Sequence, residues 1–149
     1  MSTLQDTIQS DLADAMRAKD EVRKSTLRML TAAVKNAQIE ARKELDDAAI
    51  LAVIQKQVKQ RRESVVEFKK GNREDLASHE EAEIAILGAY LPAQVSREEI
   101  VEAARKVIAE TGAAGPKEMG KVMPLLSKQF GASADGRTIS EVVKELLGA

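Results

Sequence analysis

The stretch "YLPAQVS", residues 90–96, separates two runs of helical pattern in this chain. A proline disfavours helical geometry in the residue before it, so a helix ends at about Leu91. Ser96 followed three residues later by Glu99 is a capping box, which indicates that another helix begins there. The expected units are residues 1–92 and 93–149, joined by the linker "PAQVS".

The first unit contains four segments in which apolar residues recur at the spacing of one helix face. Ser2 with Gln5 forms a capping box, and Asp46 or Asp47 is placed to cap the third segment. We therefore expect four helices. They run from Ser2 to about Arg17, from Asp20 to about Lys43, from Asp46 or Asp47 to Lys70, and from Asn72 to Leu91.

The second unit begins with a helix that stops at Gly112, a residue type suited to the turn after a helix. The following "PKEMGKVMPLL", residues 116–126, contains the two residue types that favour helices least, as Gly120 and Pro124. We expect a short segment from Met119 to Met123 and a kink or restart at Pro124. Gly120 is interpreted as a place where two helices approach closely.

A third helix completes the second unit. "GASADG", residues 131–136, consists of turn residues and predicts a loop, and Thr138 with Glu141 forms a capping box for the last helix. Apolar residues make up 44% of the chain and aromatic residues only 2%, which favours packed helices over sheets. The predicted fold class is all-α, with a four-helix unit joined to a small three-helix tail domain.

Charge and cysteine content narrow the classes of function. Lys and Arg (23) nearly balance Asp and Glu (24), so any attraction to nucleic acid or lipid has to be local. The absence of cysteine excludes disulfides and thiolate metal sites. Residues 1–16 lack an apolar signal core, and no stretch approaches the length of a membrane span. We expect a cytoplasmic protein without a membrane partner.

The sequence offers no catalytic constellation. His79 is the single histidine and lies off the apolar stripe, which is typical of a solvated surface residue. Glu80, Glu81 and Glu83 are the densest carboxylates, and with His79 they are a weak pattern for a metal site compared with a charged, exposed face. Phosphate-binding loops and nucleophile elbows are absent from the sequence. We therefore predict no catalytic residues, no metal and no cofactor.

Basic residues give the stronger signals, in one segment of each unit. In "KQVKQRR", residues 56–62, no acidic residue interrupts the cations, although such stretches commonly only solvate a helix. In the tail domain a cationic face beside a glycine can contact phosphate through side chains and backbone N–H groups. The candidate nucleic-acid contacts are Lys117, Lys121, Lys128 and Arg137 in the tail domain, and Lys59, Arg61 and Arg62 in the first unit.

With these segments laid out, the chain resembles the YqeY family, the free-standing relative of the C-terminal region of the B subunit (GatB) of tRNA-dependent amidotransferase. The similar motifs keep their order over nearly the whole chain. They are "VRKSTLRML" (22–30), "KQRRES" (59–64), "FKKGNREDLASHEEAEIAIL" (68–87), "YLP" (90–92), "EMGKVM" (118–123) and "ADGR" (134–137).

This resemblance implies an all-helical protein with an N-terminal helical domain and a C-terminal tail domain. In the amidotransferase the corresponding region contacts the tRNA body, whereas activation and ammonia transfer occur in other domains and subunits. A free-standing member would keep the tRNA contact, with Lys121 of "EMGKVM" and Arg137 of "ADGR" as its principal tail-domain contacts. Amidotransferase-like subunits are then candidate protein partners, and no DNA is expected.

Two alternatives stay open beside a non-catalytic tRNA module. One is a helical adaptor domain, in which the tail docks another protein and the cations only keep it soluble. The other is a carbon–nitrogen ligase that uses glutamine as amide donor, and it follows from family association alone. Few aromatic residues are present to stack on unpaired bases, so bound RNA would be recognised by its backbone and shape.

Overall fold

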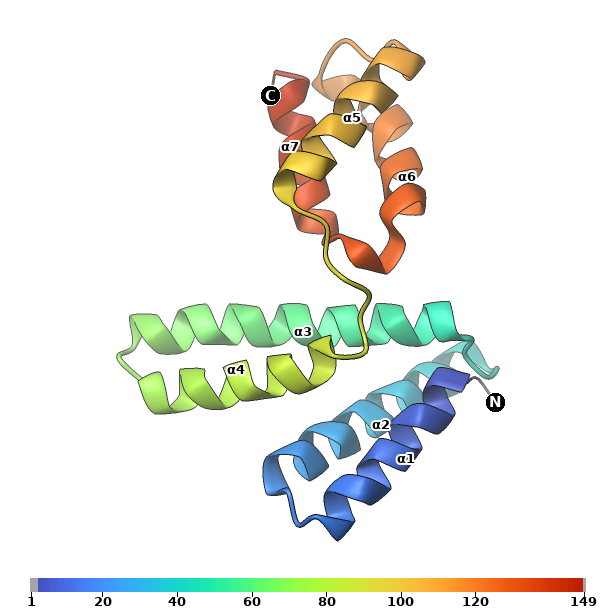
Figure 1. The fold of residues 1–149 in the computed structure, drawn as a ribbon. Coiled ribbons are helices and arrows are strands. Elements are labelled where there is room, and N and C mark those ends of the chain that lie inside the picture. The colour runs from blue at the N-terminus through green and yellow to red at the C-terminus, as the bar shows by residue number, and fades with distance from the viewer. Residues whose placement is uncertain (1–2, 149) are drawn as a thin grey trace. The chain divides into compact units, whose positions relative to one another are not determined.

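The structure is a computed structural model that describes residues 3–148. Within these residues the chain forms seven α-helices, two short 3-10 helices and no strand, which confirms the predicted all-α fold class. The chain divides into two compact units, Met1–Leu91 and Pro92–Ala149, called unit 1 and unit 2 below (Figure 1). No helix in the described part of the chain is both long and apolar enough to cross a membrane.

Unit 1 contains four helices whose starts follow the caps present in the sequence. Asp20 accepts a hydrogen bond from the backbone N–H of Arg23 at 3.2 Å, and Asp46, rather than Asp47, accepts one from Ala49 at 2.8 Å. The predicted cap Ser2 lies outside the described residues. The helices are α1 (Thr3–Arg17), α2 (Glu21–Ala41), α3 (Asp47–Lys70) and α4 (Glu74–Gly88).

The helices of unit 1 pack as two antiparallel pairs of chain neighbours, α1 with α2 and α3 with α4 (Figure 1). One hydrophobic cluster joins them, and it consists of aliphatic side chains because aromatic residues are so few. Full burial of each large aliphatic side chain contributes roughly 1.5–3 kcal/mol. The buried members are Ile8, Ala15, Leu27, Leu30, Val34, Leu45, Ile50, Ile54, Val58 and Leu87.

Unit 2 has its own core between α5 (Arg97–Thr111), α6 (Met119–Phe130) and α7 (Gly136–Leu146). Two short 3-10 helices, η1 (Pro116–Glu118) and η2 (Gly131–Ser133), precede α6 and follow it. The helix α5 forms as predicted: the Ser96 hydroxyl accepts from the N–H of Glu99 at 3.2 Å, and Gly112 takes φ 71° after the last turn. The buried members of this core include Ile100, Ala104, Val122, Leu126, Ile139, Val142 and Val143.

Three expectations for unit 2 are wrong. The helix α6 runs unbroken through Pro124, so no new helix starts there. A Cβ placed on Gly120 would meet nothing within 4 Å outside its own helix, so this glycine marks no close approach of helices. The helix α7 starts at Gly136, where Asp135 accepts a hydrogen bond from the N–H of Arg137 at 3.2 Å. Thr138 therefore lies inside the first turn and does not cap the helix.

Most of the predicted linker forms hydrogen bonds to, or packs against, unit 2. The backbone N–H of Val95 donates to the carbonyl of Ser133 at 2.9 Å, and the Gln94 side chain donates to the carbonyl of Ala132 at 3.0 Å. Val95 also packs against the unit 2 core. The segment before α5 thus belongs structurally to unit 2.

Candidate nucleic-acid interface

One side of α6 carries two of the four predicted tail-domain cations. Lys121 and Lys128 are both exposed and stand seven residues apart, so they fall within about 20° of each other around the helix and about 10 Å apart along it. Leu125 lies between them with 48% of its surface exposed, and Lys117 is exposed in η1 just before the helix. We call Lys117, Lys121, Leu125 and Lys128 the α6 flank.

The charge of the α6 flank is partly neutralised at one position. The Lys121 ammonium lies 3.1 Å from Oε2 of Glu118, and the N–H of Ala114 donates to Oε1 of the same carboxylate. The hydrogen bond from Lys121, followed by that from Ala114, holds the pKa of the Glu118 carboxyl below its usual value. Lys117 and Lys128 have no ion-pair partner among residues 3–148, so they are the freer cations of this flank.

Arg137 lies in the first turn of α7, as an exposed side chain. Its Nε is 3.3 Å from Oε1 of Glu141, one helical turn away. Asp135 caps this helix by accepting a hydrogen bond from the N–H of Arg137, its second residue, at 3.2 Å. This cap uses one N–H group of the helix start, and the contact of phosphate with the Arg137 side chain and with backbone N–H groups stays a prediction.

The acidic neighbours of Lys121 and Arg137 are a feature that the sequence interpretation left out. Glu118 precedes Lys121 by three residues and Glu141 follows Arg137 by four, which are the spacings at which charges pair on a helix. This spacing would have identified both pairs. Because both ion pairs are exposed and therefore weak, each cation can exchange its carboxylate partner for a phosphate.

The first-unit candidates separate into two kinds. Lys59 and Arg62 are exposed on α3 and have no ion-pair partner in the described part of the chain. Arg61 points into unit 1 with 8% of its surface exposed, and its Nε donates to Oε2 of Glu83 at 2.8 Å. Its Nη1 also donates to the Gln57 side chain at 2.7 Å. Arg61 is occupied in this way and we leave it out of the candidate surface.

The acidic run of α4 does not assemble into a site. His79 is about half exposed, and its Nε2 lies 3.2 Å from Oε1 of the buried Glu83. Glu81 instead faces outward and pairs with Lys69 at 3.1 Å. Among residues 3–148 no three histidine, aspartate or glutamate side chains are grouped so that they could hold a metal ion.

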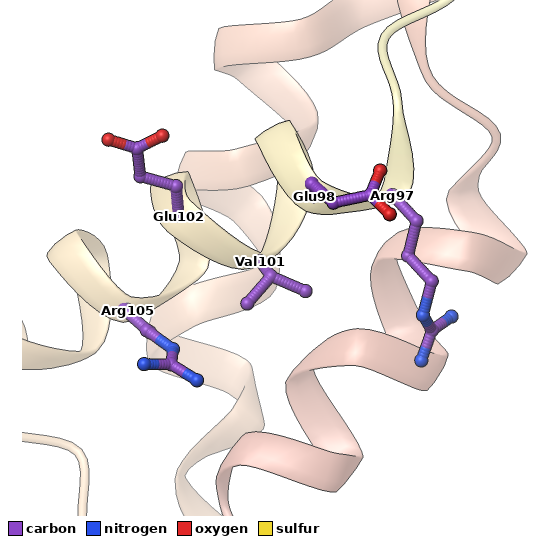
Figure 2. A pocket seen from close by; sticks show the side chains of 5 residues that line it. All are labelled: Arg97, Glu98, Val101, Glu102 and Arg105. Carbon is purple, nitrogen blue, oxygen red and sulfur yellow. The ribbon is translucent and has the colours of Figure 1, made fainter.

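An open hollow of about 370 Å³ lies along the outer face of α5 (Figure 2). Val101 forms its floor, with two arginines and two glutamates around it, all from the same helix. One of them, Arg97, lies 2.7 Å from Glu145 of α7. Small-molecule sites are largely enclosed, whereas this hollow is open to solvent. Its lining residues are Arg97, Glu98, Val101, Glu102 and Arg105.

Comparison with known proteins connects this structure to one family. The sequence model of the family described as Yqey-like protein matches residues 5–147. "Altered inheritance of mitochondria protein 41, mitochondrial" of Pyrenophora tritici-repentis is 32% identical over 147 residues, which are 95% of this chain and 80% of that protein. The proteins of the same name from Lachancea thermotolerans and Kluyveromyces lactis are 45% and 42% identical over 56% and 62% of this chain.

These relatives correct one expectation. All three are named as mitochondrial proteins, which overturns the expectation of a cytoplasmic protein. The matched part of this chain spans only about half the length of the two yeast relatives, 46% and 52%.

Proposed function

This chain belongs to the Yqey-like protein family, and we propose that it is a non-catalytic binding module that contacts tRNA and works beside an amidotransferase-like assembly. The choice of tRNA comes from the resemblance to the amidotransferase B subunit. The names of the relatives lead us to propose the mitochondrion as its setting.

The single observation that carries this proposal is the charge of α6. It has two lysines and no carboxylate over its whole length, and both lysines lie on one exposed side. Phosphate contacts by lysine and arginine supply most sequence-independent affinity for nucleic acids. Lys59 and Arg62, both exposed on α3, are further proposed contacts.

The test is tRNA binding over a series of salt concentrations. Lys121→Ala with Arg137→Ala is expected to weaken binding and to lower the slope of log affinity against log salt by about one per lost phosphate contact. Lys117→Ala with Lys128→Ala is expected to do the same. Lys144→Ala, which removes an exposed cation from α7, is the matched control and should change neither quantity appreciably. Equal affinity of the parent and both double variants at every salt concentration would refute the assignment.

Glu118→Gln tests the same contact through a change in the opposite direction, a gain in tRNA affinity. It removes the carboxylate that pairs with Lys121 at 3.1 Å while keeping the size of the side chain. If Lys121 binds phosphate, affinity should rise about two- to fivefold, because an exposed ion pair no longer competes. Unchanged affinity would mean that Lys121 does not touch the RNA.

A second candidate function is a protein adaptor, and Leu125 favours it. This leucine is 48% exposed in the centre of the α6 flank, where a protein partner would bury it. Leu125→Ser should abolish capture of such a partner from extract, in the presence or absence of ribonuclease. A partner that is lost after ribonuclease digestion supports the RNA proposal instead.

A further inference from the structure

The exposed side of α2 carries a regular array that no part of the proposed function uses. From Val22 to Ile39 the sequence has no acidic residue, the longest such run on a helix of unit 1. Arg28, Ala32, Lys35 and Ile39 are all exposed there. Their spacing of four, three and four residues places them within about 60° around the helix. We call these four residues the α2 stripe.

The cations of the α2 stripe are not used inside the molecule. Arg28 and Lys35 have no ion-pair partner among residues 3–148, although most other cations of unit 1 helices pair with a carboxylate. Ile39 is 65% exposed, more than any other large apolar side chain in the described part of the chain. A nucleic-acid backbone would meet the cations but would gain nothing from burying Ile39. The alternation of cation and apolar residue fits an opposing helix.

The complementary pattern is present in the same protein, on α4. This helix has five carboxylates and neither lysine nor arginine. Its exposed side carries Glu74, Ser78, Glu81 and Ala85, which repeat the same spacing of four, three and four residues. We call these four residues the α4 stripe.

We propose that the α2 stripe of one molecule docks on the α4 stripe of a second copy, so that the protein associates with itself through unit 1. In a parallel, in-register contact Arg28 meets Glu74 and Lys35 meets Glu81. The same register places Ile39 over Ala85, whose small side chain admits a larger neighbour. Ala32 lies opposite Ser78, so the two backbones can approach closely between the charged pairs.

The existing contacts of the α4 stripe do not prevent this docking. Glu74 has no ion-pair partner in the described residues, and Glu81 pairs with Lys69 at 3.1 Å with both side chains about half exposed. Exposed ion pairs of this kind contribute little to the stability of the fold, so Glu81 can exchange Lys69 for another cation. A contact of a few helical turns belongs to the small, transient class of interfaces, and its ionic part weakens as salt rises.

Sedimentation of the full chain over a range of protein concentrations tests the proposal. We expect the parent to associate reversibly at about 0.05 M salt and much less at about 0.5 M salt. Arg28→Glu with Lys35→Glu places like charges opposite each other, and association should weaken about tenfold or more. Glu74→Lys with Glu81→Lys should weaken it in the same way.

Mixing the two charge-reversed variants distinguishes docking from misfolding. In each variant alone, the α2 stripe and the α4 stripe carry charges of the same sign and repel each other. In the mixture, an acidic stripe of one variant can again meet a basic stripe of the other. Restored association in the mixture requires both variants to be folded and supports the proposal. A monomeric parent, an undiminished reversed variant or a mixture that stays monomeric overturns it. Association of the parent that disappears on ribonuclease treatment also overturns it, because RNA then bridges the molecules.

Engineered cysteines test the register, since the natural chain has none. Ala32→Cys mixed with Ser78→Cys should give a disulfide-linked dimer on mild oxidation, because these positions would lie within the reach of a disulfide. Ala32→Cys mixed with Ser10→Cys, an exposed position on α1, is the matched control. Equal yields of dimer from both mixtures contradict the proposed contact.

Discussion

Arg61 and Glu83 form an ion pair inside unit 1, where their exposed fractions are 8% and 5%. Removing two charges from water costs several kcal/mol per ion, so such a pair depends on its additional hydrogen bonds. Gln57 accepts from Arg61 Nη1, and His79 lies against the second oxygen of Glu83. The Arg61–Glu83 pair joins α3 to α4, and the contacts of Gln57 and His79, each within its own helix, hold its two side chains in place.

Removing one partner of this pair is expected to destabilise unit 1 strongly. Glu83→Ala leaves the Arg61 guanidinium buried without a counter-charge, and the free energy of unfolding of unit 1 should fall by about 3–5 kcal/mol. Arg61→Met combined with Glu83→Leu removes both charges, and its stability should equal or exceed that of the parent. Urea unfolding of the three proteins measures the difference. A double variant as unstable as Glu83→Ala contradicts this account.

Tyr90 links the end of α4 to the other helix pair of unit 1. Its hydroxyl donates to Oδ2 of Asp11 at 2.6 Å, and Arg23 lies 3.8 Å from the other oxygen of this carboxylate. Burial, then the hydrogen bond to Asp11 and its charge, raise the pKa of the Tyr90 hydroxyl above its ordinary value. The folded state therefore favours the protonated tyrosine.

The stability that Tyr90 supplies should depend on pH in a defined direction. It is fully present below the unfolded pKa of about 10 and is lost as pH rises beyond that value, because the unfolded chain then releases a proton that the folded chain retains. Tyr90→Phe should cost about 1 kcal/mol at neutral pH. The difference between parent and variant in urea unfolding should shrink at alkaline pH. A difference that grows with pH would contradict the protonated hydrogen bond.

Single residues also show where sequence reasoning reached its limit. Lys121 and Lys128 share one side of a helix by their seven-residue spacing, provided that the helix continues through Pro124, as it does. Arg61 stood in the same kind of basic run as Arg62, but its partner Glu83 is 22 residues away on another helix. Local spacing identifies pairs within one helix and carries no information on pairs that only packing creates.

At the scale of elements, α6 explains how Gly120 and Pro124 coexist in one helix. A proline lacks the N–H that would bond to the carbonyl four residues earlier, and its ring crowds that carbonyl, here of Gly120. Gly120 is exposed and has no side chain to add to this crowding. The pair lies in the first half of a 12-residue helix, so most of its hydrogen-bond ladder is unaffected.

Gly120→Ala distinguishes a tolerated glycine from a required one. The new Cβ would meet no atom outside its own helix within 4 Å, so the gain in helix propensity, about 1 kcal/mol, should stabilise unit 2. Thermal unfolding followed by circular dichroism measures this effect. A destabilised variant would show that the backbone freedom of Gly120 is what accommodates Pro124.

Helix starts were predictable where one cap was available and less so where two competed. Asp20 and Ser96 are the caps that the sequence indicated, and both accept the expected hydrogen bonds. Before α7, Asp135 and Thr138 are both good caps, and Gly136 between them reads as a loop residue. The packing of Ile139 into the core favours the earlier start, and this contact is not visible in the local sequence.

At the scale of the whole molecule, each unit has a separate hydrophobic cluster, and no buried residue of one belongs to the other. Two units with separate cores are expected to unfold as two cooperative transitions. Tyr90 is the single tyrosine, tryptophan is absent, and Tyr90 lies in unit 1. Tyrosine fluorescence therefore follows unit 1, whereas circular dichroism follows both units.

Core substitutions should shift only one of these transitions. Leu27→Ala is expected to lower the stability of unit 1 by about 2–5 kcal/mol and to move the fluorescence transition. The part of the circular dichroism change that belongs to unit 2 should stay in place. Leu126→Ala, the matched change in the other core, should leave the fluorescence transition where it is. One shared transition in both variants would mean that the units unfold together.

The compartment could not be predicted at this scale. The prediction rested on balanced charge, the absence of cysteine and the absence of long apolar runs. Proteins of several compartments share these features, so they do not identify one compartment. The all-α fold class, in contrast, followed from helical periodicity and scarce aromatic residues, because these directly determine how side chains can pack.

The pairing of α1 with α2 and of α3 with α4 also bears on how the polypeptide reaches its native state. Partners that follow each other along the chain meet after closing only a short loop, which lowers the entropic barrier to their encounter. Both pairs can form while the rest of the nascent chain is still being synthesised. Rapid folding of the N-terminal half would then shield its aliphatic side chains from aggregation before the C-terminal half is complete.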